Sequence, residues 1–544
     1  MWFSAVARAA DLRLLAGLWG EDAWRHTGHG GNSGVYRPLA LATLVGESLV
    51  HHGAAWALHL TNVLLHVATT VLLGALLAAL VQGARPRAAA PPGPWVSLAP
   101  WCAAAVFGVH PLHTEAVDSI FNRSEILATL GVVGALWAVW AHRRARPLLA
   151  WGLAAGCYLV ALFSKESGVT LPLLVVLVVG LLAPEPWRQR ARSLAPVVTL
   201  AAPLALYLSM RERAIPWPAL GASRLEVYLG TETWAQRLRV VASTTFDAWK
   251  LLVWPHPLRC FYEVGEGRGL ALTVPVHAAI VGVAVALRRF PALLAGVLGF
   301  YAAILPSTRL VTDLSRVVQE FGERYVYLPS ALLAVPLAFG LARLADRWGP
   351  RALLATTAVL CALLGALTFA RNRDWHGNVA LFSAECAVDP DGPRGTIALA
   401  RAFLAAPPAP AGPAFCRRYL ARHPERVEVS EICGQIYERA GLAADEEATL
   451  RRLWAYEGSA RALLALARAH DRAGDRALAA LEFEIALAGG LDPSARHLRL
   501  GEAIARRLPA RREAARAEFV AADPSSGVAR EWIRRLDAGA ELPP

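Results

Sequence analysis

Residues 54–82 read AAWALHLTNVLLHVATTVLLGALLAALVQ and contain no Asp, Glu, Lys or Arg. The hydrocarbon core of a bilayer is about 30 Å thick, and a helix needs about 20 apolar residues to cross it. Runs of this length and composition are typical of transmembrane helices rather than of buried helices in soluble domains. The stretch therefore predicts a membrane-spanning helix.

The same pattern recurs between short linkers that contain Arg or Pro. The overall composition agrees, because 55% of the 544 residues are hydrophobic and only 18% are charged, whereas soluble proteins have about 25% charged residues. The sequence thus predicts an all-α, multi-pass membrane domain over residues 54–371 with about ten spans. The nine further apolar runs are 96–112, 124–142, 148–164, 168–184, 194–210, 271–287, 291–306, 325–343 and 351–370.

The chain has 55 Lys and Arg residues against 43 Asp and Glu, a formal net charge of +12. Most of the excess lies in the short linkers, and by the positive-inside rule these linkers face the cytoplasm. The charge is therefore explained by topology, and no nucleic-acid partner is predicted. The Arg-rich linkers are 84–95, 142–147, 184–193, 288–291 and 343–351; residues 1–53, the longer loops and the tail are predicted on the other side.

An external position of residues 1–53 creates a conflict at the start of the chain. Residues 1–19 have no apolar core of the length that a signal sequence or a span needs. We expect that residues 1–53 form an external loop region and that a first transmembrane helix, with part of the loop after it, is missing from this sequence. An apolar run in the upstream reading frame would support this expectation.

From residue 372 onward the long apolar runs stop, and the sequence becomes self-similar. A period of about 33 residues with small residues at matching positions is typical of tetratricopeptide repeats, whose paired helices approach closely. Residues 372–544 are therefore predicted to form a tetratricopeptide-like α-solenoid, with a plain helical bundle as the alternative. Units are expected at about 427–460, 461–494 and 495–528, with a degenerate unit over 380–425; Gly434, Tyr437 and Gly441 recur as Ala467, His470 and Gly474.

Polar residues gather near span ends on the predicted non-cytoplasmic side, where a site should be sought. They form four groups: Tyr36-Arg37, residues 110–125, Lys165-Glu166 and Glu323-Arg324-Tyr325. The seven cysteines have no CxxC or clustered spacing, so neither a metal site nor a disulfide scaffold is indicated.

Each polar group also has a structural interpretation. Cations near span ends usually extend toward the interface, and histidines at helix ends are usually structural. Lys165 favours function more than most, because the chain uses Lys only twice and places this one beside Glu166 between two spans. His110, His113 and Glu115 have a spacing that could hold a metal, but three such residues alone are weak support for one.

The chemistry of these groups suits a substrate linked to a lipid phosphate. Arg and Lys bind a phosphate or pyrophosphate leaving group, a carboxylate accepts the proton of an acceptor hydroxyl, and the tail could present the acceptor. The chain has no phosphate-binding loop, dinucleotide fingerprint, nucleophile elbow or HExxH motif.

At this point a resemblance can be stated. The chain resembles the transmembrane and tetratricopeptide-repeat O-mannosyltransferases and their bacterial relatives, which have the GT-C glycosyltransferase fold. Six segments in order support the resemblance: residues 35–67, FGVHPLHTEAVDSIFNRSEILATL (107–130), FSKESGVTLPLL (163–174), LLVWPHPLRCFYE (251–263), ERYVYLPS (323–330) and residues 371–395.

The resemblance implies transfer of a hexose, mannose in the eukaryotic members, from a polyprenyl-phosphate donor to a protein hydroxyl with inversion. It implies that Glu115, His113 and His110 line the catalytic cavity. Glu166 and Glu323 would orient the cations that contact the donor phosphate. Those phosphate-binding residues would be Tyr36, Arg37, Arg123, Lys165 and Arg324.

One departure matters, because the acidic pair of the family's first external loop would lie upstream of Met1. Glu21-Asp22 comes too late to replace it. A longer gene product or an inactive relative would explain this departure. The competing functions are a non-catalytic, membrane-anchored repeat scaffold and, less consistent with polar residues at one face, a transporter.

The remaining expectations concern partners and location. We expect a polyprenyl-phosphate-linked sugar, a protein acceptor bound by the repeats, and membrane lipid as partners. Cofactors are unknown: the sequence leaves a divalent metal possible but does not indicate one. The expected location is a bacterial inner membrane with the tail in the periplasm, or the lumenal equivalent in a eukaryote.

Overall fold

The computed structural model describes residues 12–22, 35–84, 93–215, 234–262, 269–308, 321–522 and 526–538. The chain divides into two compact units, Met1–His376 and Gly377–Pro544. Over the described residues it is α-helical, with one isolated bridge between Tyr262 and Phe321 in place of any strand. The prediction of an all-α chain is confirmed for these residues.

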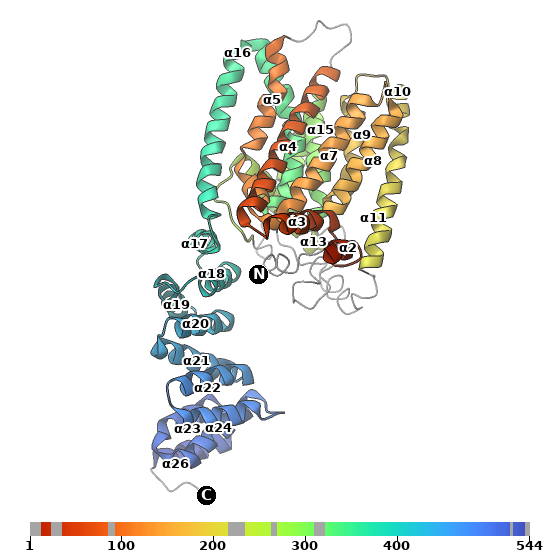
Figure 1. The fold of residues 1–544 in the computed structure, drawn as a ribbon. Helices are drawn as coiled ribbons and strands as arrows, with labels where there is room; N and C mark the ends of the chain where they lie inside the picture. Colours follow the sequence, from red (N-terminus) through yellow and green to blue (C-terminus); the bar gives the residue numbers. More distant parts are fainter. Residues whose placement is uncertain are drawn as a thin grey trace. The chain divides into compact units, whose positions relative to one another are not determined.

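The first unit is a bundle of long helices that run between two ends (Figure 1). Short helices connect the long ones at the end where α3 lies, and α10 lies at the opposite end. The described helices are α2 Leu12–Gly17, α3 Pro38–His51, α4 Ala55–Gly83, α5 Pro94–Gly108, η2 Pro111–His113, α6 Thr114–Asp118, η3 Ile120–Asn122, α7 Arg123–His142, α8 Pro147–Ser164, η4 Glu166–Thr170, α9 Leu171–Leu182, α10 Trp187–Leu194, η5 Ala195–Leu200, α11 Ala201–Ala214, α13 Trp234–Val253, α14 Leu270–Ala286, α15 Pro291–Ile304, η7 Leu305–Ser307, η8 Glu323–Val326 and α16 Tyr327–Asp374.

All ten predicted apolar runs lie on helices of this unit. By length and composition, five helical stretches could cross a membrane, and the pair α5 and η2–α6, bent by 54°, could form a sixth. Four further apolar helices of this unit are shorter: Pro38–His51, Glu166–Leu182, Leu270–Ala286 and Pro291–Ser307. The number of ten spans therefore stays a prediction, whereas several apolar helices are present.

Two of the predicted spans, 325–343 and 351–370, lie on α16, which is interrupted at Gly349. The φ of Gly349 is 78° and its ψ is −177°, a backbone conformation that favours glycine. Pro350 follows, and proline disfavours a helical conformation at the residue before it. The Gly-Pro pair therefore separates two helical halves.

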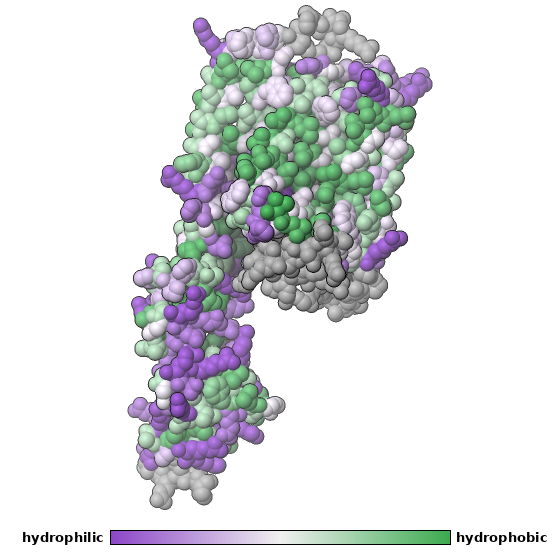
Figure 2. Space-filling view, viewed as in Figure 1, coloured by the Kyte–Doolittle hydropathy of each residue, from purple (hydrophilic) through white to green (hydrophobic). Residues whose placement is uncertain are grey.

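The visible surface of the first unit is mostly apolar (Figure 2), with hydrophilic residues concentrated toward its ends. Large apolar side chains such as Trp56, Leu64, Leu148 and Val198 are exposed. Exposed apolar area of this extent is expected where lipid replaces water as the solvent. This surface agrees with an integral membrane protein.

Close helix packing brings the polar segments together. A Cβ atom on Gly131 of α7 would lie 2.5 Å from the carbonyl oxygen of Cys157 on α8, and one on Gly168 would lie 2.9 Å from the carbonyl carbon of Ala161. Helices without side chains at their contact can approach in this way. The first turn of α7 is thereby held against the end of α8 and the start of η4.

The second unit is a succession of helices that pack in pairs. Pairs α20–α21, α22–α23 and α24–α25 coincide with the three predicted repeat units. In two of these pairs, the turn between the first and the second helix has a glycine at positive φ: Gly441 at 69° and Gly474 at 87°. The helices are α17 Asn378–Val388, α18 Pro393–Ala405, α19 Ala411–Arg422, α20 Val427–Arg439, α21 Ala443–Glu457, α22 Ala460–Arg472, α23 Arg476–Leu487, α24 Pro493–Arg507, η9 Pro509–Arg511, α25 Arg512–Ala521 and α26 Gly527–Asp537.

A disulfide corrects the interpretation of the cysteines. Cys416 on α19 and Cys433 on α20 are bonded, with their Cα atoms 5.6 Å apart, and both side chains are fully buried. The sequence separation of 17 residues gave no recognisable motif, because the bond depends on how two helices pack. The other five cysteines, which also lie among the described residues, are not in disulfide bonds.

Candidate functional site

Most of the predicted site residues lie at the end of the first unit where α3 lies. They come from the segment before α3, from η2 and α6, from the start of α7, from the turn after α8, and from η8. Each of these segments connects or begins a long helix. Residues far apart in the sequence therefore meet at one end of the bundle.

Arg37 and Glu166 form a buried ion pair. The Nη2 atom of Arg37 lies 2.9 Å from Oε2 of Glu166, and Nε lies 3.3 Å from both carboxylate oxygens. Each residue is 7% exposed. The predicted orienting role of Glu166 toward Arg37 is consistent with this geometry.

Lys165 is paired with a carboxylate that the sequence analysis gave no role. Its ammonium contacts Glu125 in the first turn of α7 and lies 4.4 Å from the ring centroid of Tyr325. Lys165 and Glu125 are 4% and 2% exposed. Burial, together with the charges of Arg37 and Arg324, lowers the pKa of Lys165 well below its ordinary value, although Glu166 and Glu115 oppose the shift.

Arg324 and Glu115 form the third pair. The backbone N–H of Arg324 donates to Oε2 of Glu115 over 2.8 Å, and its guanidinium contacts Oε1. Nη2 of Arg324 also donates to the hydroxyl of Tyr325 over 3.0 Å. The side chain of Arg324 is 25% exposed, so this pair is partly accessible from outside the protein.

Together these residues form a cluster that we call the paired-charge cluster. It has three cations and three carboxylates, each cation is matched to its own carboxylate, and the formal charge is zero. Buried ion pairs are costly to desolvate and often add no net stability, and ionisable residues in a membrane protein's interior usually have a function. The members are Arg37, Lys165, Arg324, Glu166, Glu125 and Glu115.

Glu323 lies beside this cluster but has other partners. Its Oε1 accepts hydrogen bonds from the Tyr262 hydroxyl at 2.7 Å and the Arg259 backbone at 2.5 Å. Nη2 of Arg371 on α16 lies 3.9 Å from the same oxygen. The structure thus brings Glu323 to Arg371 rather than to the side chains of Arg37 or Lys165.

His110 and His113 are packed into a ring cluster at the bend between α5 and α6. Nε2 of His110 lies 3.2 Å from the Leu252 carbonyl, and its Nδ1 accepts from the Leu112 backbone. The His113 ring is 2% exposed and lies 4.3 Å from Phe107 and 4.8 Å from Tyr327. The nitrogen Nε2 of His113 binds the Ser330 hydroxyl, whereas Nδ1 has no partner among the described residues.

Arg123 is fully buried in a separate network. Its guanidinium binds Asn62, the Leu58 carbonyl and Thr43, and lies 2.8 Å from Glu47. These partners fix the start of α4 against α7. The structure thus brings Arg37, Lys165 and Arg324 together and places Arg123 apart from them, so its contact with the donor phosphate stays a prediction.

Tyr36 lies beside Arg37, and its ring packs near Phe163 and Tyr207. Its hydroxyl donates to the Trp19 carbonyl over 2.8 Å. Burial raises the pKa of Tyr36 to about 12, so the hydroxyl stays a neutral donor at physiological pH. A neutral hydroxyl can donate to a phosphate oxygen.

Sequence reasoning gave no role to several members of this region: Glu125, Tyr325, Tyr262 and Arg371. All four stand inside the quoted segments, and Glu125 and Tyr325 also belong to the polar groups named from the sequence. Their roles depend on partners more than 30 residues away, such as Lys165 for Glu125. Among the residues that the structure describes, no group of three or more His, Cys, Asp or Glu side chains could hold a metal ion.

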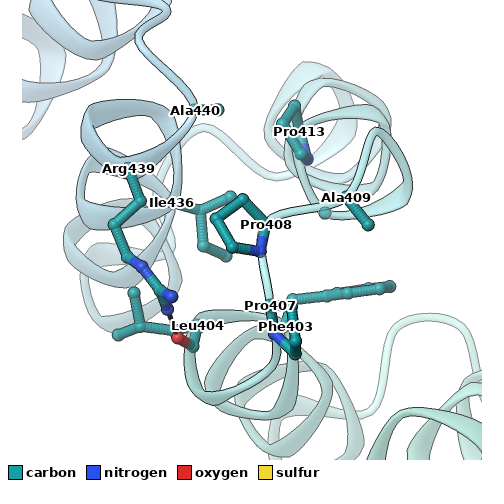
Figure 3. A pocket seen from close by; sticks show the side chains of 10 residues that line it. Phe403, Leu404, Pro407, Pro408, Ala409, Pro413, Ile436, Arg439 and Ala440 are labelled. Carbon is teal, nitrogen blue, oxygen red and sulfur yellow. Dashed lines mark hydrogen bonds between the residues drawn. The ribbon is translucent and has the colours of Figure 1, made fainter.

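A pocket in the second unit has few polar side chains in its lining (Figure 3). It lies between α18, α19 and α20, beside the Pro-rich connection 407–413, and is lined mainly by apolar side chains such as Phe403, Pro408 and Ile436. The one charged side chain in its lining, Arg439, donates to the Leu404 carbonyl. We assign no reaction to it.

Comparisons with known proteins relate this chain to protein O-mannosyl-transferases. It is 28% identical over 190 residues to protein O-mannosyl-transferase Tmtc3 of Drosophila melanogaster, covering 31% of this chain and 20% of that protein. It is 32% identical over 150 residues to protein O-mannosyl-transferase TMTC2 of Mus musculus and of Homo sapiens, covering 26% of this chain and 16% of each relative.

The chain thus matches about a fifth or less of the length of these curated relatives. No family model matches it. No solved structure matches it either. Homology to part of the O-mannosyl-transferases is therefore the relationship that these comparisons support, and it suggests a glycosyltransferase.

Proposed function

We propose that this protein is a membrane glycosyltransferase that moves a hexose from a polyprenyl-phosphate donor to a hydroxyl of a protein. The paired-charge cluster is the observation that supports the proposal. Three cations at one end of a lipid-facing helical bundle match the needs of a lipid-linked phosphate leaving group. The names of the relatives favour mannose as the sugar and a protein as the acceptor.

In the proposed reaction, Arg37, Lys165 and Arg324 bind the donor phosphate. Glu115 accepts the proton of the acceptor hydroxyl as that oxygen forms a bond to the anomeric carbon. The bond from this carbon to the phosphate oxygen breaks, and the polyprenyl phosphate leaves with the electron pair. A single displacement of this kind inverts the anomeric carbon.

Glu166 is proposed to hold Arg37 in its orientation. His110 and His113 shape the cavity wall at the bend between α5 and α6. We keep Tyr36 as a further hydroxyl donor to the phosphate, because it adjoins Arg37 and stays neutral. The proposal requires no cofactor beyond the donor.

The site is proposed to face the periplasm or the lumen. Arg188, Arg190 and Arg192 belong to α10, which lies at the end of the first unit opposite α3 (Figure 1). By the positive-inside rule, the end with these arginines is cytoplasmic. The Cys416–Cys433 disulfide supports an external tail as well, because disulfides persist in oxidising compartments.

The tail is proposed to be a tetratricopeptide-like solenoid that binds the acceptor polypeptide. Small residues at the predicted positions support this idea: a Cβ atom on Gly434 would lie 2.9 Å from Leu450, and one on Gly501 would lie 3.0 Å from Phe519. The paired helices thus approach closely where the repeat pattern requires small residues.

The direct test measures transfer of radiolabel from polyprenyl-phosphomannose to a protein acceptor by membranes that contain the full chain. We expect Lys165→Ala and Glu115→Gln each to lower the rate by about 100-fold or more, as removal of a phosphate ligand or a general base does. Lys250→Ala is the matched control, since Lys250 is exposed on α13.

Unchanged transfer in both site variants would overturn these site assignments. Absence of transfer by the wild-type chain, with intact folding, would favour the alternative of a non-catalytic, membrane-anchored repeat scaffold. Binding of partner proteins by the tail would then be the activity to measure.

A further inference from the structure

Glu125 is the member of the paired-charge cluster whose purpose the proposed reaction does not explain. It is 2% exposed, in the first turn of α7, and it faces Lys165 from the turn after α8. A carboxylate that only neutralised the lysine would weaken phosphate binding. Its position therefore calls for a role that changes when the donor binds.

The three carboxylates of the cluster differ in how many donors hold them. Glu166 accepts from both Nε and Nη2 of Arg37, and Glu115 accepts from the backbone and the guanidinium of Arg324. Among the described residues, the Lys165 ammonium is the hydrogen-bond partner that the structure gives Glu125. Glu125 is thus the carboxylate that would lose its hydrogen-bond partner if the Lys165 ammonium bound another anion.

A phosphodiester that binds Lys165 adds one negative charge to a cluster of formal charge zero. The Glu125 carboxylate would then be buried without a partner, and a buried carboxylate without its cation is strongly destabilised. Buried groups in this position become neutral by taking up a proton. Charge balance and burial therefore both favour protonation of Glu125 when the phosphate binds Lys165.

The charged and titratable groups that interact with Lys165, the partner of Glu125, come from several elements. They are Arg37 before α3, Glu166 next to Lys165, Glu115 of α6, and Arg324 and Tyr325 of η8. In the structure Arg37 and Arg324 are already paired with Glu166 and Glu115. Neither cation is therefore a ready substitute for Lys165 at Glu125.

We propose that Glu125 takes up one proton when the phosphate of the lipid-linked donor binds Lys165, so that donor binding consumes one proton from solution. The inference rests on the proposed function, because it assumes that the phosphate reaches Lys165. The Lys165–Glu125 hydrogen bond breaks, a contact between Lys165 and a phosphate oxygen forms, and the carboxylate becomes a carboxylic acid.

The number of protons taken up does not depend on where the shared proton lies beforehand. Burial lowers the pKa of Lys165, and the free pair holds one proton whether it sits on Nζ or on the carboxylate. The bound state needs two, one on the ammonium that faces the phosphate and one on Glu125. One proton is therefore added in either case.

The test measures the Kd of polyprenyl-phosphomannose for the purified full chain in nanodiscs between pH 6 and 8, without acceptor. The phosphodiester keeps one negative charge over this range, so the ligand adds no pH dependence. We expect Kd to rise about tenfold per pH unit, the slope for uptake of one proton. A change of less than twofold across the range would overturn the inference.

Glu125→Gln removes the titrating group and keeps the shape of the side chain. The Kd of this variant should rise less steeply with pH than that of the wild type, and at pH 8 the variant should bind the donor more tightly. Glu185→Gln is the matched control, because Glu185 pairs with Arg143 and Arg144 at the opposite end; it should keep the wild-type slope. A Glu125→Gln variant that keeps the full slope would contradict the proposal.

A second measurement needs no variant. Calorimetric titration of the wild-type chain in two buffers with different protonation enthalpies gives the number of protons taken up per donor bound, and we expect about one at pH 7. Zero protons with clear binding would overturn the inference and leave the proposed function standing. No binding at any pH would overturn both.

Discussion

The Arg37–Glu166 pair shows what a single buried contact contributes to this site. Arg37 uses two nitrogens against one carboxylate, a geometry that lysine cannot reproduce. The pair joins the segment before α3 to the start of η4. It therefore fixes the position of one proposed phosphate ligand, Arg37, relative to Lys165, which directly precedes Glu166 in the chain.

Glu166→Ala should destabilise the first unit, because it leaves the Arg37 guanidinium buried without a partner. Removal of one member of a buried pair costs about 3 kcal/mol or more. The double variant Arg37→Met with Glu166→Leu should recover a substantial part of that loss. Thermal unfolding in detergent measures both, and equal loss in the single and double variants would contradict this account.

A buried histidine pair makes the stability of the tail depend on pH. Nδ1 of His470 lies 2.7 Å from Oε2 of Glu482, and both side chains are at most 3% exposed. Burial alone lowers the pKa of His470, but Glu482 and Glu447 outweigh it and raise the pKa above its ordinary value. Burial raises the pKa of Glu482, against the opposing effect of His470.

Both shifts mean that the folded tail binds more protons than the unfolded tail does. The stability that His470 contributes is therefore fully present below pH 6.5, the unfolded value for histidine, and is lost as pH rises through the folded pKa of His470. We expect the tail's Tm to fall by a few degrees between pH 6 and 8. His470→Gln should remove this difference, whereas His423→Gln, at the α19–α20 connection, should keep it.

At the scale of helices, the close contact between α7 and α8 brings Glu125 to Lys165. Gly131→Val should cost about 1–3 kcal/mol, because its Cβ would meet the backbone of Cys157 at 2.5 Å. It should also lower the transfer rate by moving the two helices apart. Gly152→Val on α8 is the control, since no heavy atom lies within 4 Å of its added Cβ; an equal effect at both positions would contradict the prediction.

The link between α19 and α20 depends on one covalent bond. Cys416→Ser should lower the free energy of unfolding of the tail by about 3 kcal/mol, the loss of loop entropy for a closure of this size. Cys386→Ser, at a free cysteine, should leave it nearly unchanged. Chemical denaturation of the full chain with and without reductant measures the difference, and reductant should add nothing further to the Cys416→Ser variant.

At the scale of the whole molecule, the proposed topology separates the two ends of the first unit. Trp187 at the start of α10 is 71% exposed, and Trp254, close to the His110 contact, is 67% exposed. Cysteine at position 254 should react with an impermeant thiol reagent in intact cells or spheroplasts. Cysteine at position 187 should react only after permeabilisation, and the reverse pattern would place the site in the cytoplasm.

Local patterns were enough to predict most of the helices. Apolar runs between Arg-containing linkers marked most long helices of the first unit, although α13, Trp234–Val253, lies in a segment predicted as a loop. The period of small residues marked the three helix pairs of the tail. Both signals work because a helix in lipid satisfies its own backbone hydrogen bonds and needs only a continuous apolar sequence. Even so, the bend between α5 and α6 became visible only in the structure, whereas the break at Gly349 falls inside the linker 343–351 that the sequence predicts.

The sequence by itself also determined which residue types are available for chemistry, including the unusual Lys165 and its neighbour Glu166. Only the tertiary structure decided their partners: Glu166 binds Arg37, 129 positions away, and Glu115 binds Arg324, 209 positions away. It likewise brought Glu125 to Lys165 and joined Cys416 to Cys433. The physical reason is that helix formation depends on neighbours along the chain, whereas ion pairs and disulfides depend on which helices pack together.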